Sequence, residues 1–336
     1  MERIGGASVL VTGGSRGLGL LLARQCVERG CAVTIAARDE AELDRAVALL
    51  RRRARAHGAP DSSVSSRVCD VRDRTAVREL MARTAEERQG LDVVLANAGI
   101  IQVGPAEAAG TEAFRAAMET MFFGALHTAM EALPHLRRSP VGGRLGLIGS
   151  VGGLLPVPHL LPYSCAKAAI AALADGLRAE ESEHGVGVTA IHPGLMRTGS
   201  HLQAEFAGDA GREYAWFSTL AGLPLLSMDA RRAAERIVDA VDRGRPRLIL
   251  TPAARLGATA YGLAPSLVTR ANALVGRLMP AAGRETAGTV QGRRVAARDD
   301  GRARWQATVS ALTDRAAEQL NETDGHEAHR PTTRRP

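Results

Sequence analysis

The first 252 positions alternate between short apolar runs rich in β-branched residues and longer amphipathic stretches. The apolar runs predict seven strands, at residues 8–12, 31–38, 65–71, 91–99, 144–149, 186–194 and 246–252. The amphipathic stretches predict helices between them, including those at residues 40–57, 73–89, 111–136 and 160–184. Strands that alternate with helices build a parallel sheet covered on both faces. We therefore predict an α/β fold with a doubly wound parallel sheet of seven strands.

A different pattern begins after residue 252. Residues 266–278 gather their leucines and valines on one helical face, and Arg270 and Arg277 lie off that face. We expect this face to pack on the rest of the chain or on a sister subunit of a homo-oligomer. Peripheral contact with a membrane surface is the alternative. The predicted units are a main domain at 1–252, a helical extension at 253–320 with an irregular part at 281–304, and a disordered polar tail at 321–336.

Composition indicates a globular protein and argues against nucleic-acid binding. The 336 residues are 45% hydrophobic and 24% charged, which is typical of a globular chain with a sizeable core. The net charge of +7 comes from arginine, because Lys167 is the single lysine among 43 basic residues. The arginines are scattered and are not interleaved with aromatic residues, so we do not expect nucleic-acid binding.

Cysteine spacing and the amino terminus bear on the cellular compartment. The four cysteines form no CxxC pair and no His/Cys cluster, so we expect neither a metal site nor a disulfide framework. The amino terminus lacks the pattern of a signal peptide. No run approaches 18 apolar residues, so no membrane span is expected. These features predict a reduced, cytoplasmic protein.

The residues with the clearest chemistry lie in SVGGLLPVPHLLPYSCAK, at positions 150–167. On a helix, Tyr163 and Lys167 share one face one turn apart. A nearby ammonium favours the phenolate and lowers the tyrosine pKa toward a value useful for acid–base catalysis. Ser150 ends the strand before them, where its hydroxyl could bond a substrate oxygen. An ordinary surface helix with this spacing is the alternative.

A glycine-rich turn follows the first strand and precedes a helical pattern. Strand, glycine turn and helix together are the setting in which a backbone approaches a pyrophosphate at a helix amino terminus. The spacing is TGxxxGxG rather than GxGxxG, and a surface turn without a ligand is the alternative. The candidate cofactor-binding residues of this turn are Gly13, Ser15, Arg16, Gly17, Leu18 and Gly19.

The ends of the next strands suggest which dinucleotide would bind. An acidic residue after the second strand would bond a ribose 2′-hydroxyl, whereas an arginine suits a 2′-phosphate. Here Ala37 precedes Arg38, and Arg16 lies in the glycine turn, so NADP(H) is favoured and NAD(H) stays possible. Asp39 is expected to open the next helix. Two further candidates are Asp70, which could meet the adenine, and the small turn Asn97-Ala98-Gly99, against which a ribose could lie.

Taken in order, the motifs TGGSRGLG, CDV, NAG, YSCAK and HPGLMRT resemble the short-chain dehydrogenase/reductase superfamily over about residues 5–252. The resemblance implies a Rossmann fold that binds NAD(P)(H), with Tyr163 as general acid/base and Ser150 orienting the substrate oxygen. It implies that Lys167 contacts the nicotinamide ribose and lowers the tyrosine pKa. The further cofactor-contacting residues that it implies are Val71 of CDV and Pro193, Gly194 and Thr198 of the nicotinamide pocket.

One position departs from the family pattern. Met121 stands three residues before Gly124, where the family often has an asparagine that helps to hold a proton-relay water. A thioether is a weak acceptor, so the relay must differ, and core packing is the better account of Met121.

The family places a substrate lid at about 199–228. Four of the ten aromatic residues lie there, at Phe206, Tyr214, Trp216 and Phe217. They indicate either an apolar substrate pocket or ordinary packing.

The function predicted from sequence is an NADPH-preferring oxidoreductase that interconverts a ketone or aldehyde and an alcohol on a small apolar substrate. One alternative is an NAD-dependent alcohol dehydrogenase of the same fold. The other is a non-catalytic NADP-binding regulator, which the intact Ser150, Tyr163 and Lys167 disfavour.

Overall fold

A parallel sheet of seven strands forms the centre of the computed structural model, which describes residues 4–223, 227–280, 288–298, 317 and 319–322. The strand order is β11-β7-β6-β4-β1-β2-β3, and every pairing is parallel. All seven predicted strands are confirmed; β1 has its predicted bounds, β3 begins one residue earlier and ends sooner than predicted, and the others are shorter. Their bounds are Ser8–Thr12 (β1), Ala32–Ala37 (β2), Val64–Val68 (β3), Val93–Ala96 (β4), Arg144–Ile148 (β6), Gly187–His192 (β7) and Arg247–Ile249 (β11).

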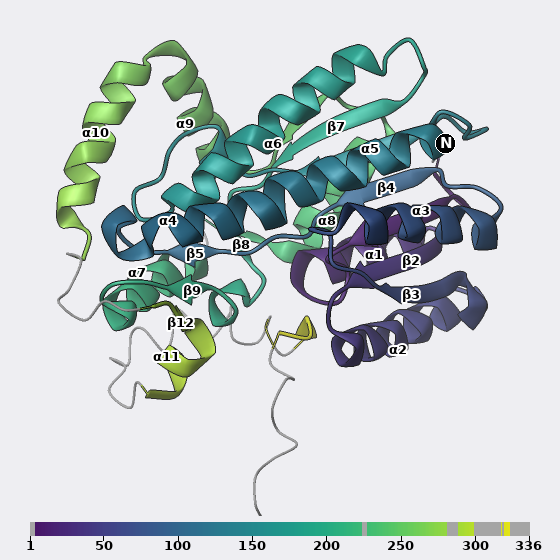
Figure 1. Ribbon diagram of the computed structural model, residues 1–336, viewed down its shortest axis with the longest axis horizontal. Coiled ribbons are helices and arrows are strands. Elements are labelled where there is room, and N and C mark those ends of the chain that lie inside the picture. Colours follow the sequence, from purple (N-terminus) through teal and green to yellow (C-terminus); the bar gives the residue numbers. More distant parts are fainter. Residues whose placement is uncertain (1–3, 224–226, 281–287, 299–316, 318, 323–336) are drawn as a thin grey trace, which may run out of the picture.

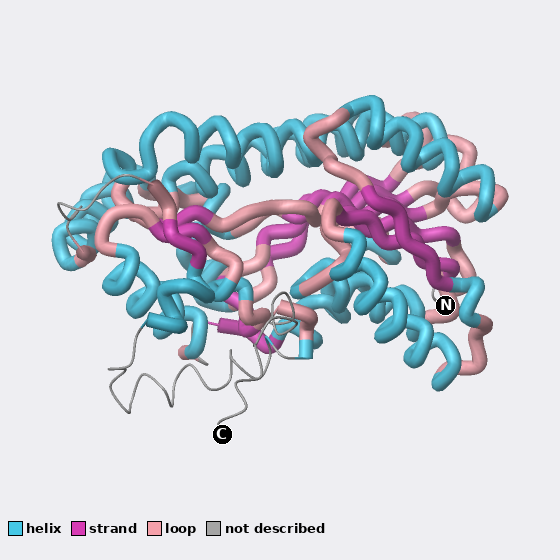
Figure 2. The backbone as a smooth tube through the Cα atoms, turned by 60° about the horizontal axis from the view of Figure 1, so that its bottom comes forward, coloured by secondary structure: helices cyan, strands magenta, loops and turns pink. Residues whose placement is uncertain are grey.

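Helices cover both faces of this sheet, as Figures 1 and 2 show. One face carries α1 (Gly17–Glu28), α2 (Glu40–Ala56) and α8 (Ala230–Asp242). The other carries α3 (Arg74–Arg88), α5 (Gly124–Leu136) and α6 (Leu161–Glu180). Central strands are thus buried on both sides, which explains why β1 and β4 read as continuous apolar runs rather than as alternating ones. The doubly wound α/β fold is confirmed.

Helix starts follow the capping residues in the sequence. Asp39 accepts a hydrogen bond from the Glu42 backbone N–H at 2.8 Å and caps α2, as expected for an acid one residue past Arg38. Asp73 caps α3 in the same way.

The helix predicted at 111–136 is confirmed in its bounds but is not one regular helix. It comprises the part of α4 (Ala106–Ala117) that follows Gly110, a π-helical turn at Met118–Phe123, and α5, which ends at Leu136. Gly110 has a positive φ of 66° and a non-helical backbone, so it separates the short turn before it from the helix that begins at 111. A π-turn adds a residue to the helix and is common at functional sites.

A smaller layer lies beside the carboxyl ends of the strands. Short strands β5 (Gln102–Val103), β9 (Glu205–Phe206) and β12 (Val290–Gln291) pair under helix α7 (Ala210–Gly222). A second pair joins β8 (Leu195–Arg197) to β10 (Ser227–Asp229). Residues 290–298, expected to be irregular, instead form β12 and α11 (Gly292–Arg298), because they add to the lid sheet through Phe206. The last helix suggested by the sequence pattern, at 305–320, falls largely outside the described residues.

Helices α9 (Pro252–Leu263) and α10 (Pro265–Leu278) form a hairpin that extends from the body in Figure 1. The α10 helix is confirmed, but the expectation that its leucines pack on the rest of the chain is wrong. Leu267 is 68% exposed and Leu278 is 87% exposed. The opposite side of α10 makes the contact, since Asn272 Nδ2 donates to Pro156 O at 2.8 Å. Among the described residues, no helix is long and apolar enough to cross a membrane.

Candidate active site

Ser150, Tyr163 and Lys167 meet at the carboxyl end of β6. Ser150 follows the strand, and its Oγ accepts from the Gly152 backbone N–H at 3.0 Å in a single 3₁₀ turn. Helix α6 then presents Tyr163 and Lys167 one turn apart. A Cβ at Gly153 would lie 2.4 Å from the Lys167 backbone carbon, so glycine is required for the turn to approach α6 this closely. The structure therefore brings together the three residues that the sequence singled out.

Burial dominates the electrostatics of this cluster. Lys167 is 4% exposed, its Nζ donates to Ile148 O at 2.7 Å, and burial lowers its pKa to about 8. Burial raises the pKa of the Tyr163 phenol, and a hydrogen bond with Ser150 lowers it in part. The net upward shift is opposite to the lowering that we expected from Lys167. In this arrangement Nζ is bonded to Ile148 O and lies 5.7 Å from the centre of the tyrosine ring.

Met121 and Asn97 serve as packing and bracing residues. Met121 is fully buried in the π-turn, and a Cβ at Gly99 would lie 3.4 Å from its Cγ, which agrees with the core role expected for it. Asn97 Nδ2 donates to Thr12 O at 3.2 Å and to Gly13 O at 3.0 Å. The asparagine thus fixes the glycine turn against β4, while Ala98 lies directly against Gly13.

The glycine turn has the geometry of a phosphate cradle. Gly13 and Gly17 have positive φ values of 64° and 54°. A Cβ at Gly19 would lie 1.9 Å from Gly13 O, so no larger residue fits there. Ser15 is buried, and Leu18, in the first turn of α1, packs against the core. The amino terminus of α1 faces the glycine turn. These residues fit a dinucleotide pyrophosphate, which binds the free N–H groups of such a terminus.

The part of the site that is expected to contact the ribose 2′ position contains acidic residues as well as arginines. Arg16 Nη1 lies 2.7 Å from Glu42 Oε1, and Ser15 Oγ donates to the other Glu42 oxygen at 3.0 Å. Arg38 is exposed beyond β2.

The adenine candidates lie on the next strand end. The Asp70 carboxylate is hydrogen-bonded to Arg72, which holds its pKa below its usual range, and Arg38 adds to this effect. Val71 is buried against Gly124.

The residues expected at the nicotinamide follow β7 and contact the catalytic turn. Pro193 O accepts from the Val151 backbone N–H at 2.9 Å. A Cβ at Gly194 would lie 2.9 Å from Thr251 Oγ1, and Thr198 is buried, with its Oγ1 accepting from Ser200 N at 3.2 Å. The HPGLMRT segment therefore adjoins the turn that carries Ser150.

The fold and this arrangement agree with comparisons to known proteins. A family model described as short chain dehydrogenase matches residues 7–206. The chain belongs to this family. Short chain dehydrogenases are NAD(P)-dependent oxidoreductases that act on alcohol and carbonyl groups, and this chain is an enzyme of that class.

Individual relatives cover different shares of this short chain dehydrogenase. The L-fucose dehydrogenase of Bos taurus is 34% identical over 58% of this chain and 68% of its own. A dehydrogenase/reductase SDR family protein 7-like of Anopheles gambiae is 30% identical over 79% of this chain and 82% of its own. A crystal structure of a short-chain dehydrogenase from Streptomyces avermitilis gives a TM-score of 0.67 at 28% identity, over 81% of this chain and 98% of that one.

The segment expected to form a substrate lid has its own small core. Phe206, Tyr214 and Phe217 are 0%, 2% and 5% exposed and pack together. Three of the four aromatics that could have lined an apolar pocket are therefore mainly packing residues.

A buried cluster that the sequence analysis missed joins this lid to the loop before α6. Glu213 on α7 accepts from Trp216 Nε1 at 2.6 Å and lies 2.7 Å from His159 Nδ1. Burial raises the pKa of Glu213, and the bond to Trp216 opposes that shift. No short sequence motif could reveal the pairing of His159 with Glu213, because the two residues are far apart in the sequence.

Residues 319–322, near the carboxyl end of the chain, contact the glycine turn. The sequence pattern did not indicate this contact. The tail was expected to be disordered from Asn321, yet Asn321 and Glu322 are 5% and 6% exposed. The prediction is wrong at these two residues because side-chain hydrogen bonds, rather than an apolar pattern, hold them in place. Leu320 O accepts from the Gly17 backbone N–H at 3.0 Å.

Proposed function

We propose that this dehydrogenase interconverts a ketone or aldehyde and an alcohol with NADP(H), with Tyr163 as general acid and base. The observation that carries the proposal is the convergence of Ser150, Tyr163 and buried Lys167 at the carboxyl end of β6. When bound, the reduced nicotinamide supplies a hydride to the carbonyl carbon. Tyr163 Oη donates its proton to the carbonyl oxygen, and Ser150 Oγ holds that oxygen by a hydrogen bond.

Lys167 keeps the proton transfer possible. With a pKa of about 8, its ammonium is mostly charged at pH 7 and can stabilise the phenolate that forms on Tyr163. We infer that Nζ exchanges its bond to Ile148 O for one to the nicotinamide ribose. Met121 offers no amide for a relay water, so we infer that Tyr163 recovers its proton from bulk water.

Cofactor preference rests on the arginines at the ribose end. Arg38 is exposed and Ala37 places no acid at the end of β2, whereas Arg16 is already paired with Glu42. We therefore assign most of the preference for a 2′-phosphate to Arg38. NADPH is expected to bind at least about tenfold more tightly than NADH, a difference of about 1.4 kcal/mol.

Fluorescence titration of both cofactors measures this preference. Replacing Ala37→Asp and Arg38→Ala together should reverse it, because the new carboxylate bonds a 2′-hydroxyl and repels a phosphate. Arg55→Ala is the matched control, since Arg55 is also exposed but pairs with Asp61 away from the turn. Equal wild-type affinities for NADPH and NADH would make an NAD-dependent dehydrogenase the better assignment.

We propose an apolar substrate on the basis of the loop between Ser150 and Tyr163. This loop presents a run of half-buried apolar side chains, namely Leu154, Leu155, Val157, Leu160 and Leu161. Such side chains favour an apolar ligand because burying them against it removes apolar surface from water. One relative is named for L-fucose, a polar sugar, so the proposal stands on these residues of the chain itself.

We also propose that the α9–α10 hairpin contacts an anionic membrane surface. Leu256, Leu263, Leu267, Leu274 and Leu278 are between 60% and 87% exposed. Residues 252–280 contain three arginines and no acidic residue, so the hairpin has the charge that anionic headgroups attract. The bond from α10 to Pro156 places the hairpin, by the side of α10 opposite these leucines, next to the apolar loop.

Co-sedimentation with vesicles tests the membrane contact. The protein should pellet with vesicles that contain anionic lipid and much less with neutral ones, because both apolar area and charge contribute. Leu267→Asp with Leu274→Asp should abolish pelleting, whereas Val141→Asp, an exposed apolar site at the opposite end of β6, should not. If the wild type does not pellet with vesicles but dimerises through these leucines, the exposed face of the hairpin binds a second copy of the chain instead.

A further inference from the structure

The amino terminus of α1 is contacted by a segment near the carboxyl end of the chain, described at Ala317 and at residues 319–322. The Gly17 N–H, one of the groups that a pyrophosphate would bind there, donates to Leu320 O at 3.0 Å. At the other side of the site, Ala317 is fully buried against Gly199, next to Thr198. The segment thus crosses from the proposed nicotinamide pocket to the glycine turn.

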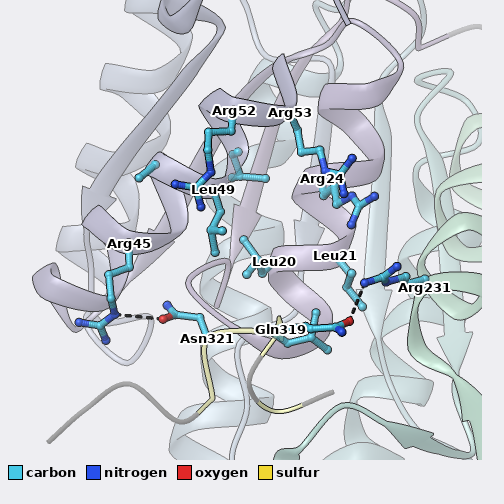
Figure 3. A pocket seen from close by; sticks show the side chains of 13 residues that line it. Leu20, Leu21, Arg24, Arg45, Leu49, Arg52, Arg53, Arg231, Gln319 and Asn321 are labelled. Carbon is cyan, nitrogen blue, oxygen red and sulfur yellow. Dashed lines mark hydrogen bonds between the residues drawn. The ribbon is translucent and has the colours of Figure 1, made fainter. Parts of the chain in front are cut away.

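Polar side chains on both sides tether this segment. Asn321 Nδ2 donates to Ser15 O at 2.9 Å, and Arg45 Nε donates to Asn321 Oδ1 at 3.0 Å. Arg231 Nη2 donates to Gln319 Oε1 at 2.6 Å. Figure 3 shows Arg45 and Arg231 reaching the segment from opposite walls of a cleft beside α1 and α2. Both arginines therefore bond neutral amide oxygens of the segment.

Glu322 places a carboxylate where a phosphate would lie. Its Oε1 is 2.6 Å from the position of a Cβ built on Gly17, and its Oε2 is 3.5 Å from Arg16 Nε. Its backbone oxygen accepts from Gln203 Nε2 at 2.8 Å, which fixes the end of the segment. One N–H group and one guanidinium cannot bond both this segment and a pyrophosphate in full.

We propose that residues 319–322 are an autoinhibitory segment that must leave the glycine turn before NADP(H) binds. This regulation rests on the proposed cofactor site. The measured dissociation constant for NADPH is then the intrinsic constant divided by the fraction of molecules in which the segment has left. Any change that weakens the tethers raises that fraction and tightens binding.

Protonation of Glu322 sets a pH dependence for the segment. Burial raises its pKa to about 7; Arg16 opposes this shift and Glu42 adds to it. The bound segment therefore holds a proton that the released segment loses above its ordinary value of 4.5. The stabilisation is full below about pH 4.5 and falls as pH rises through about 7, so the segment should leave more readily at pH 8 than at pH 6.

Full-length tether variants test the proposal by NADPH fluorescence titration. Asn321→Ala removes the bonds to Ser15 and Arg45 and should tighten NADPH binding about fivefold or more. Arg45→Ala should also tighten it, although it deletes a positive charge. Arg52→Ala is the control, because Arg52 lines the same cleft and should leave affinity unchanged or weaken it.

Hydrogen exchange supplies a second readout that does not depend on turnover. The peptide that contains residues 319–322 should be protected in the free protein and should lose protection when NADPH is added. Tighter binding by Asn321→Ala together with this loss supports the proposal. Equal NADPH affinities in the wild type and all variants would overturn the proposal. Hydrogen-exchange protection of residues 319–322 that increases when NADPH is added would also overturn it, because a lid that closes over the cofactor would behave in that way. Absence of NADPH binding even in Asn321→Ala would instead contradict the proposed cofactor site.

Discussion

Tyr163→Phe is expected to lower turnover by about a thousandfold or more while NADPH affinity changes only a few-fold. The substitution removes the one proton that the proposed mechanism transfers and keeps the ring that packs beside Lys167. Positioned general acids contribute about 10²–10⁴ to rate, and the loss of the only such group in the cluster should reach the upper part of that range. Steady-state reduction of a carbonyl, followed by NADPH absorbance, measures the effect.

Tyr261→Phe is the matched control for this substitution. Tyr261 lies on α9, outside the cluster formed by Ser150 and Lys167, so its hydroxyl has no place in the proton transfer. Turnover by this variant should equal that of the wild type. Near-wild-type turnover by Tyr163→Phe itself would refute the assignment of Tyr163 as acid and base.

Lys167→Arg is expected to lower turnover by about a hundredfold or more although the positive charge is kept. Lys167 is buried under the turn at Gly153, and its Nζ makes a single close bond to Ile148 O. A planar guanidinium is larger and has a fixed fork geometry, so it cannot occupy this space as a point charge does. Turnover and NADPH affinity should therefore both fall.

A thermal unfolding scan separates this effect from loss of the fold. Arg178→Lys on the same helix is a useful comparison. Arg178 donates to the backbone oxygens of Val188 and Gly244, so its role is to stabilise the fold. That variant should lose stability but keep turnover per folded molecule. If Lys167→Arg has full activity, the single lysine of the chain has no part in the chemistry.

The sequence predicted the sheet well because most of its strands, such as β1, β2 and β4, are short and largely apolar runs rich in β-branched residues. Helices with clear capping residues, such as α2 after Asp39, were also predicted to within one or two positions. The expectation that the leucines of α10 pack on the rest of the chain was wrong, because amphipathic spacing indicates an apolar face but does not show what covers it. The prediction also missed the short turn of α4 before Gly110, whose non-helical backbone separates that turn from the predicted helix.

Local motifs located the cluster of Ser150, Tyr163 and Lys167, because spacing along one helix and one strand end fixes their neighbourhood. Contacts between distant residues could not be found in this way. Three such contacts join segments that approach each other only in the folded chain. They are the pairs Arg16–Glu42, His159–Glu213 and Ser15–Asn321. The sequence likewise could not show that burial outweighs Lys167 in setting the pKa of Tyr163.

Deuteride transfer from NADPH labelled at nicotinamide C4 tests the central claim most directly. The protein would be incubated with the labelled cofactor and a panel of apolar ketones and aldehydes, and the alcohols analysed by mass spectrometry. We expect deuterium on the carbinol carbon of at least one product with the wild type and at least about a thousandfold less with Tyr163→Phe. NADPH that binds to the glycine turn without transferring deuterium to any carbonyl would contradict the account and favour a non-catalytic NADP-binding regulator.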